Sequence, residues 1–420
     1  MDQGSYRRII KQMSDKNTRK KIIVAGGGAA GCMAAIAACA SGADVTLIEK
    51  NKTVAKKILS TGNGKCNFCH DVIRPEDYHL KADDGFITSV LEAYPVEKCL
   101  EDFKKMGITP LIRDGYVYPY SEQAKSVTEV LTRSLKGVNV VTECSVTAIK
   151  KDGDKYIVKT TGKDFTSDAV IVTCGGEAAP VTGSSGEGYK FAGAFGLKRN
   201  KPVPALTSLT VKDHPYKKAA GVRIRGTVSV LIDGKEAGSD TGQIQITKTG
   251  FSGIPVFNVS RFASRALDEG KKVSVRIKFL PELFDEEIRS EFETRLSRAG
   301  QSAYDAMIGL FPDSFADALL RNAGIDPDKK TADAAKATDK LFKASRHMQA
   351  EVTGTGDMAS SQVTCGGVML SEIDASTMEC IKHKGLYLAG EVLDIDGMCG
   401  GYNLYFAWAS GYIAGTSAAR

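Results

Sequence analysis

The sequence predicts an α/β protein whose main domain is built from both ends of the chain and is interrupted by an inserted segment. Three observations predict this arrangement. A strand, a glycine-rich turn, a helix and a second strand follow one another over residues 21–49. β-type alternation and then helical periodicity occupy the middle of the chain after Gly196. From about Val352 the pattern again indicates strands and helices separated by glycines. A β-then-α segment therefore separates two halves of one α/β domain.

Composition limits the classes of protein to which the chain can belong. Hydrophobic residues make up 42% and charged residues 25% of the 420 residues, which is ordinary for a globular protein and excludes a disordered or collagen-like chain. At about 150 residues per domain, this length corresponds to two or three domains. No run approaches about 18 consecutive apolar residues, so no membrane span is expected. The net charge of +6 is compatible with an anionic ligand and does not indicate a nucleic-acid partner.

The N-terminus and the cysteines indicate a compartment. Residues 1–19 are rich in Lys and Arg without an apolar segment, so we expect a flexible leader and not a secretory signal. The ten cysteines are spread widely, and several, such as Cys32 and Cys39, lie in apolar stretches where thiols behave as small core residues. We expect a reduced, cytoplasmic protein.

The first elements form a βαβ unit. Residues 21–25 are a short apolar strand, and 26–31 are a glycine-rich turn. An alanine-rich helix follows over 32–40 and ends at Gly42, before a second strand over 44–49.

The turn matches the dinucleotide-binding fingerprint GxGxxG. Gly26 permits the tight turn, Gly28 lets a pyrophosphate approach the backbone, and Gly31 allows the helix to pack closely on the strand. The N-terminus of the helix adds N–H donors and the positive end of the helix dipole. Glu49, at the end of the second strand, is placed to accept hydrogen bonds from an adenosine ribose. The sequence therefore predicts a Rossmann-like dinucleotide site.

Later segments favour FAD over NAD as the dinucleotide. An apolar strand over 168–176 ends in paired glycines, and a strand–glycine–acid unit over 385–404 leads into a helix that begins with two more glycines. Glu391 is expected to face the ribityl chain or, through water, the pyrophosphate. The N–H groups of 400–404 suit the pyrimidine edge of a flavin. A tightly packed sheet edge is the alternative interpretation of 385–404.

Further elements are predicted from periodicity and turn residues. The first half contains a helical segment near 86–106, a turn-rich aromatic stretch over 116–120 and strands over 138–173. The inserted segment begins with strands, and Asp233-Gly234 is a hairpin signal between them. These strands are expected at 203–211, 222–232, 243–248 and 272–279. Helical periodicity then covers 282–322, and 324–340 is a solvated connection or a weak surface helix.

Cys66-Asn-Phe-Cys69-His70 has the CxxCH form of a haem attachment motif. Covalent haem attachment normally occurs outside the cytoplasm, which disagrees with the expected compartment. A zinc site needs two further ligands at a matching spacing, and the other cysteines and histidines are too scattered. A redox dithiol is a further alternative. We expect instead that residues 60–67 form a glycine-rich loop against the cofactor, and we predict no metal site.

Several motifs together resemble one known family. They are Gly26–Gly31, Lys56–Asn67, Tyr118–Tyr120, Gly183–Gly188, Thr364–Val368 and Gly390–Gly397. The TGNGKCN and GGYNL stretches are the most specific of the matches. On these residues the chain resembles the bacterial YhiN-like flavoproteins, which include BaiN-type bile-acid reductases and aminoacetone oxidase-like proteins. The resemblance covers nearly all of residues 20–420.

The resemblance implies FAD on a two-part, Rossmann-like domain of the glutathione-reductase type, with an inserted β-barrel domain and a helical subdomain. The implied domain borders are 20–195 with 350–420 for the FAD-binding domain, 196–280 with 341–349 for the barrel, and 281–340 for the helical subdomain.

The resemblance also implies a set of FAD-binding residues. The pyrophosphate would be held by Gly26, Gly28, Ala29, Ala30 and Gly31, and the adenosine end by Glu49, Lys50 and the backbone of Val146. The flavin would be lined by Lys57, Thr61, Gly64, Lys65, Cys66 and Asn67. The site would be completed by Gly175, Gly176, Glu391, Gly401, Asn403 and Leu404.

Two positions depart from the family pattern. Cys69-His70 stands where the family more often has small polar residues and Asn. Lys248, within Thr247–Gly253, replaces a histidine that the family usually has.

The activity implied is an FAD-dependent reduction of activated C=C bonds, such as those of 3-oxo-Δ4 or Δ4,6 bile acids or steroids. The partner is then a small hydrophobic substrate. NADH or NADPH would bind transiently as the electron donor, because no second GxGxxG occurs in the chain. Tyr118, Tyr120 and Tyr402 are candidate proton donors, with aromatic packing as the alternative role of each. The competing functions are a flavin amine oxidase and a non-catalytic, flavin-bearing protein that binds RNA or another partner.

Overall fold

The computed structural model describes residues 19–79, 85–298, 300–331 and 333–420. The leader expected over 1–19 lies almost entirely outside these described residues. The chain divides into two compact units, which are treated separately below. The first unit runs up to Pro202 and resumes from Gly366 to Arg420, and the second unit comprises Val203–Cys365. The borders implied by the family resemblance are near 195 and 350.

The elements of the first unit begin with a βαβ unit and end with the longest helix. Its strands are β1 (Lys21–Ala25), β2 (Asp44–Ile48), β3 (Cys69–His70), β4 (Pro110–Arg113), β5 (Tyr116–Pro119), β6 (Asn139–Val141), β7 (Val146–Asp152), β8 (Lys155–Thr160), β9 (Phe165–Ser167), β10 (Ala169–Val172) and β19 (Leu386–Leu388). Its α-helices are α2 (Ala29–Ala40), α3 (Phe86–Ala93), α4 (Val96–Met106), α5 (Ala124–Ser134), α6 (Glu187–Ala194) and α11 (Tyr402–Ala419). The 3-10 helices are η1 (Lys56–Gly64), η2 (Pro75–Asp77), η3 (Pro180–Thr182) and η6 (Leu370–Glu372).

The elements of the second unit are a set of barrel strands followed by helices. The strands are β12 (Leu209–Val211), β13 (Arg223–Ile232), β14 (Lys235–Ile246), β15 (Gly250–Ser252), β16 (Val273–Phe279) and β17 (Met348–Thr355). The helices are η4 (Lys217–Ala219), α7 (Ile254–Asp268), α8 (Asp285–Leu296), η5 (Asp305–Met307), α9 (Asp313–Asn322) and α10 (Ala334–Arg346). The strands β11 (Arg199–Ala205) and β18 (Val363–Val368), which contain the two crossings, pair as a two-stranded sheet.

A five-stranded parallel sheet in the order β19-β10-β1-β2-β6 forms the centre of the first unit. The register places Ile22 of β1 opposite Ala169 of β10 on one side and Val45 of β2 on the other. β10 is buried along its whole length, as expected for an inner parallel strand that is covered on both faces. This sheet confirms the predicted Rossmann-like fold class.

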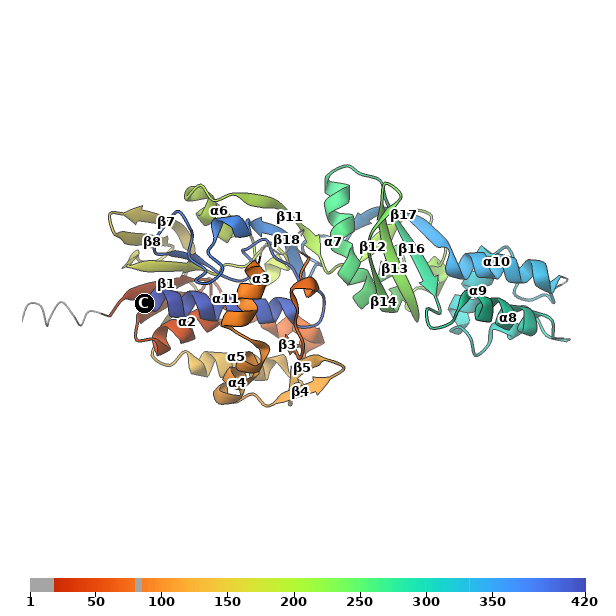
Figure 1. The fold of residues 1–420 in the computed structure, drawn as a ribbon, viewed down its shortest axis with the longest axis horizontal. Coiled ribbons are helices and arrows are strands. Elements are labelled where there is room, and N and C mark those ends of the chain that lie inside the picture. The colour runs from red at the N-terminus through yellow and green to blue at the C-terminus, as the bar shows by residue number, and fades with distance from the viewer. Residues whose placement is uncertain (1–18, 80–84, 299, 332) are drawn as a thin grey trace, which may run out of the picture. The chain divides into compact units, whose positions relative to one another are not determined.

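The helices α2 and α11 pack along each other in the first unit, although they are far apart in the sequence (Figure 1). Glycines of α11 make this close approach possible. A Cβ at Gly411 would lie 2.4 Å from the carbonyl oxygen of Ala30, and one at Gly415 would lie 2.3 Å from that of Ala34. Both distances are far below van der Waals contact, so the two backbones meet with no side chain between them.

The second unit contains a closed barrel in the order β12-β15-β14-β13-β16-β17. Its longest strands, β13 and β14, are joined by the expected hairpin, in which Asp233 and Gly234 both have positive φ angles. Strand β17 closes the barrel by pairing with β12 and β16 (Figure 1). The inserted β-barrel of the predicted fold class is therefore confirmed.

Helices α8, α9 and α10 share one hydrophobic cluster with this barrel. Arg346, at the end of α10, is 2% exposed and connects the helices to the barrel. Its guanidinium group donates to the carboxylate of Asp285 and to the carbonyl oxygens of Phe279, Leu280 and Leu283. The bonds from Arg346 hold the pKa of Asp285 below its ordinary value.

Local expectations differ from the structure in three places. The helical segment near 86–106 is two helices, because Pro95 interrupts it after Tyr94. The aromatic stretch at 116–120 is mostly a strand, β5, which pairs with β3 and β4. Part of 324–340 belongs to α10, which extends to Arg346 and buries Leu341 and Phe342.

None of the helices in the part of the chain that the structure describes is both long enough and apolar enough to cross a membrane.

The contact between α2 and α11 gives a testable prediction. Gly411→Ala or Gly415→Ala places a methyl group against a carbonyl oxygen of α2, and we expect each to destabilise the protein by about 1–3 kcal/mol. The midpoint of thermal unfolding measures this loss. Gly193→Ala in α6 is the control, because a Cβ there meets no atom within 4 Å, and its midpoint should stay the same or rise slightly. Wild-type midpoints for both α11 variants would contradict the close packing.

Candidate functional site

The turn between β1 and α2 has the backbone geometry that the fingerprint requires. Gly26 has φ +107°, and a Cβ there would lie 2.7 Å from the carbonyl oxygen of Thr173 in the segment after β10. A Cβ at Gly31 would lie 1.8 Å from the carbonyl oxygen of Gly26. A Cβ at Gly28, in contrast, would meet no atom within 4 Å. Two glycines are thus needed by the packing, while the third leaves open space in front of the helix.

This open space lies at the N-terminus of α2. Gly28 is the N-cap residue, and no side chain caps the helix. The first intrahelical bond runs from the N–H of Cys32 to the carbonyl of Gly28, so the helix itself provides no acceptor for the preceding N–H groups. These donors and the helix dipole suit an anionic group.

Glu49 lies beside this turn at the end of β2 and is 7% exposed. One carboxylate oxygen accepts the N–H of Gly27 at 2.7 Å. The other oxygen accepts the backbone N–H and the side-chain Nδ2 of Asn51, both at 2.7 Å. These bonds fix the orientation of the Glu49 carboxylate, and the oxygen that accepts the N–H of Gly27 keeps one further lone pair for a ligand hydroxyl.

The segment after β10 is held against the end of β2. The ammonium group of Lys50 forms an ion pair with Glu187 at 2.5 Å and donates to Ser185 at 2.8 Å. Although burial raises it, the pKa of Glu187 lies below its ordinary value because of Lys50. The segment begins at Gly175 and Gly176, and the carbonyl of Gly176 accepts the Ser184 hydroxyl. Lys50 and the paired glycines are therefore brought together.

A second ion pair joins two predicted site residues that are far apart in the sequence. The ammonium group of Lys57, in η1, lies 2.8 Å from Glu391 and also donates to the carbonyl oxygen of Ala178 at 3.2 Å. Both side chains of the pair are only partly exposed. Lys57 therefore connects three chain segments, each of which contains predicted cofactor-binding residues.

The loop over 61–67 has an unusual backbone. Gly62, Asn63, Gly64 and Cys66 all have positive φ angles, and for Asn63 and Cys66 such a conformation costs free energy. Strain of this kind persists where the surrounding structure enforces it, often at a ligand site. Burial raises the pKa of the Cys66 thiol to about 12, so Cys66 is not a reactive thiolate at neutral pH.

Other side chains of this loop point in different directions. The hydroxyl of Thr61 donates to the carbonyl of Ile58. Lys65 is exposed and forms an ion pair with Glu122 at 3.1 Å. The side chain of Asn67 accepts the N–H of Val117 at 3.2 Å.

The loop over 61–67 meets the N-terminus of α11. Gly401 has φ +99°, and a Cβ there would lie 2.4 Å from the carbonyl oxygen of Cys69 and 3.0 Å from Oδ1 of Asn67. Asn403 exchanges hydrogen bonds with the backbone of Gly397 at 2.9 Å. Leu404 is half-buried on the first turn of the helix. Asn67, Gly401 and Asn403 thus belong to one cluster.

Val146 begins β7 and is half-buried, and the structure does not bring it together with this cluster among the described residues.

The three candidate proton donors have different environments. Tyr120 is 69% exposed. Burial raises the pKa of Tyr118. Tyr402 is buried, which also raises its pKa, and its ring stacks on that of His70 at 4.9 Å.

Sequence reasoning missed Tyr189, although it directly follows the Gly183–Gly188 motif. Its hydroxyl is buried and has no hydrogen-bond partner among the described residues. Burial and the nearby carboxylates of Glu391 and Glu177 raise its pKa. A buried hydroxyl without a partner costs free energy, and a ligand near Glu391 would offer it one. Together with the open space at Gly28, this orphaned hydroxyl fits a bound dinucleotide such as FAD.

The comparisons with known proteins identify the family. The model of the HI0933-like protein Rossmann domain matches residues 20–417. The chain belongs to this HI0933-like family. A 3-dehydro-bile acid delta(4,6)-reductase of Clostridium scindens is 39% identical over 406 residues, which cover 95% of this chain and 99% of the relative.

Two further relatives carry a different name. A ribosomal RNA dihydrouridine synthase of Haemophilus influenzae is 28% identical over 95% of this chain and 98% of the relative. A ribosomal RNA dihydrouridine synthase of Escherichia coli is 26% identical over 93% of this chain and 96% of the relative. The relatives of this chain thus include proteins named for a bile acid and for ribosomal RNA.

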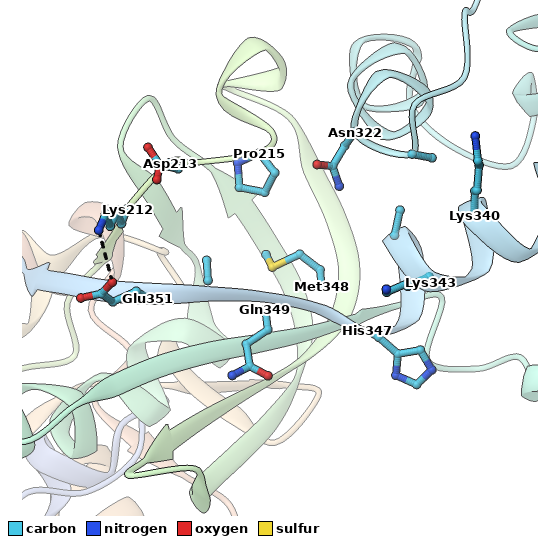
Figure 2. A pocket seen from close by; sticks show the side chains of 13 residues that line it. Lys212, Asp213, Pro215, Asn322, Lys340, Lys343, His347, Met348, Gln349 and Glu351 are labelled. Carbon is cyan, nitrogen blue, oxygen red and sulfur yellow. Dashed lines mark ion pairs between the residues drawn. The ribbon is translucent and has the colours of Figure 1, made fainter.

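The second unit of this HI0933-like chain contains a separate pocket of about 710 Å³ (Figure 2). Its lining includes Lys340, Lys343 and His347 of α10 on one side and the ion pair between Lys212 and Glu351 on the other. None of the predicted cofactor-binding residues lines it. Among the described residues, no group of three or more His, Cys, Asp and Glu side chains could hold a metal ion.

The turn before α2 gives a matched pair of variants. Gly28→Ala places a methyl group in the open space, so we expect a folded protein that binds FAD about 10- to 100-fold more weakly. Gly31→Ala drives a methyl group into the backbone of Gly26, so we expect the apoprotein itself to unfold at a lower temperature. Fluorescence titration of deflavinated protein and thermal unfolding separate the two effects. Unchanged FAD affinity in Gly28→Ala would place the dinucleotide elsewhere.

Proposed function

We propose that the chain is an FAD-dependent oxidoreductase that reduces activated C=C bonds, such as those of 3-oxo-Δ4 or Δ4,6 bile acids or steroids. The observation that carries this proposal is the 39% identity, over 99% of its length, to a relative named as a 3-dehydro-bile acid delta(4,6)-reductase. The uncapped α2 N-terminus and its glycine turn support the dinucleotide part of the proposal.

The FAD site is assigned to the cluster around α2 and α11. In this proposal the N–H groups of Ala29, Ala30 and Gly31 bind the pyrophosphate, and Glu49 binds the adenosine ribose. The loop over 61–67 and the N-terminus of α11 enclose the flavin ring. Bound there, FAD supplies two-electron hydride chemistry.

The chain's own residues would bind and orient the cofactor. The ion pair between Lys57 and Glu391 fixes the position of both side chains, which would then hold the ribityl chain. The N-terminus of α11, which begins after Gly401, would supply N–H groups and the positive end of its dipole to the flavin pyrimidine. Such donors stabilise the negative charge that reduction places on that edge.

NADH or NADPH is proposed as the electron donor that binds transiently. The single GxGxxG turn is assigned to FAD in this proposal, so the nicotinamide has no second site of that type. It would approach the same face of the flavin as the substrate.

Reduction of RNA is a second candidate function. Two relatives, 28% and 26% identical, are named ribosomal RNA dihydrouridine synthases. The higher identity to the bile-acid reductase favours a small hydrophobic substrate for this chain. An amine oxidase activity is the third candidate, carried only by the sequence resemblance.

Anaerobic stopped-flow spectroscopy of the purified holoprotein tests the proposal. NADH or NADPH should bleach the flavin absorption band, and 3-oxo-Δ4 steroids or 3-oxo-Δ4,6 bile acids should restore it. A 3-oxo steroid that has no C=C bond is the control, and it should leave the flavin reduced.

The other outcomes identify the competing functions. Restoration of the band by uridine-containing RNA, and not by enones, would favour the RNA candidate. Bleaching by amines, with peroxide release in air, would favour the oxidase. A flavin that neither nicotinamide reduces would overturn the proposed donor.

A further inference from the structure

Two cationic side chains share one carboxylate beside the loop over 61–67. Oε1 of Glu122 lies 3.1 Å from Nζ of Lys65 and accepts a hydrogen bond from Nη1 of Arg113 at 2.8 Å. The bond from Lys65, together with the charge of Arg113, holds the pKa of Glu122 below its ordinary value. These three side chains, which we call the Glu122 cluster, carry a net charge of +1.

This excess of positive charge distinguishes the cluster from other cations of the predicted cofactor site. Lys50 and Lys57 each face a carboxylate of their own, at 2.5 and 2.8 Å. Neither Lys65 nor Arg113 forms an ion pair with a described residue other than Glu122. One positive charge of the cluster is therefore left without a carboxylate.

The two cations are open to a ligand that arrives from solvent. The side chains of Lys65 and Arg113 are 52% and 54% exposed. Only Nη1 of Arg113 is used by Glu122, and the other N–H groups of the guanidinium donate to no described residue. This planar group can therefore present a pair of donors to an incoming carboxylate. Ion pairs that are this exposed contribute little to the stability of a fold.

Strand β5 connects the Glu122 cluster with the proposed flavin site. Arg113 ends β4, which pairs with β5, and the N–H of Val117 in β5 donates to Oδ1 of Asn67 at 3.2 Å. A Cβ at Gly400 would lie 2.7 Å from the ring of Tyr116, so β5 also meets the segment that leads into α11. The sheet of β3, β5 and β4 lies at the N-terminal end of α11 (Figure 1).

Tyr118 supplies a further donor between the cluster and the loop. A Cβ at Gly62 would lie 3.8 Å from Cε1 of Tyr118, so the ring lies against the loop over 61–67. Burial raises the pKa of the Tyr118 hydroxyl, while Lys65 and Arg113 act to lower it, so both cations lie within electrostatic range. The hydroxyl forms no hydrogen bond with a described residue.

We propose that Lys65 and Arg113 bind the carboxylate of an acidic enone substrate; this inference rests on the proposed function. The substrate class is then narrowed to enones that carry an acid group. A 3-oxo bile acid has a carboxylate at the end of its side chain, whereas a neutral 3-oxo steroid has none. The cluster binds this group through charge-assisted hydrogen bonds, and no covalent bond of the substrate changes there.

Equilibrium binding to the oxidised holoprotein tests the inference without turnover. The change in the flavin absorption spectrum reports the Kd of two ligands with the same rings, 3-oxo-4-cholenoic acid and its uncharged methyl ester. The wild-type protein should bind the acid about 10-fold more tightly than the ester. This preference should shrink at about 0.5 M salt, because exposed charges are screened.

Substitutions in the Glu122 cluster should act in opposite directions. Arg113→Gln removes a cation, so we expect about 10-fold weaker binding of the acid and unchanged binding of the ester. Glu122→Gln releases both cations from their carboxylate, so we expect about 3-fold tighter binding of the acid. A cluster with a purely structural role would weaken the binding of both ligands in both variants.

Arg133→Gln is the matched control. It removes the same charge from the last turn of α5 and should leave both affinities at their wild-type values. Thermal unfolding midpoints of the variants should lie close to that of the wild-type protein, because the substituted side chains are at the surface.

The phosphates of the nicotinamide are the competing anions. The concentration dependence of anaerobic flavin reduction measures the affinity for NADH and NADPH, and Arg113→Gln should leave it unchanged. If the variant weakens the binding of the nicotinamide and not that of the acid, the cluster binds the electron donor and the inference is overturned.

The remaining outcomes separate the inference from the proposed function. If the acid and the ester bind equally to the wild-type protein, or if Arg113→Gln keeps the preference for the acid, the Glu122 cluster is not the acid site. Reoxidation of the reduced flavin by either enone would still support the reductase proposal. If neither enone reoxidises the wild-type flavin, the proposed function fails and the inference fails with it.

Discussion

The first turn of α2 has almost no room for side chains around it, and the rest of the first unit depends on this constraint. The backbone of Gly31 lies against the carbonyl of Gly26, and that of Gly411 lies against the carbonyl of Ala30. A Cβ at Gly390 would lie 2.8 Å from Cβ of Ala30. The strand–helix turn, the segment after β19 and α11 therefore all converge on the same point.

This convergence explains how a site is assembled from distant parts of the chain. Because α11 must approach α2 closely, its N-terminus is held near the loop over 61–67, which precedes β3. The ion pair between Lys57 and Glu391 then joins the N-terminal and C-terminal parts of the first unit directly. The N-termini of α2 and α11 and the buried Glu49 thus belong to one unit, although the two helices are far apart in the sequence.

The sequence allowed much of this arrangement to be predicted, because glycine spacing reports backbone geometry directly. Gly26, Gly28 and Gly31 each have the environment that the fingerprint assigns to them. The strands of the inserted segment were also predictable from alternation, and one hairpin from the turn at Asp233, whereas their closure into a barrel was implied only by the family resemblance. The roles of individual cofactor-binding side chains stay predictions.

Long-range side-chain contacts could not be predicted in the same way. Nothing in the local sequence around Lys65 indicates that Glu122 will lie beside it, because the contact is made only when β5 packs against the loop over 61–67. The orphaned hydroxyl of Tyr189 likewise depends on tertiary burial. The aromatic stretch at 116–120 was expected to be rich in turns, yet pairing with β3 and β4 makes most of it a strand.

The discontinuous first unit has a consequence for synthesis on the ribosome. Its sheet lacks β19 and its helix α2 lacks α11 until residues 366–420 have been made. The second unit has its own hydrophobic cluster, so it can close as soon as Cys365 has left the exit tunnel. At roughly 5–20 residues per second, the earlier half of the first unit waits several seconds longer for its partner. During that interval the edge of β10 and the alanine-rich surface of α2 both remain uncovered.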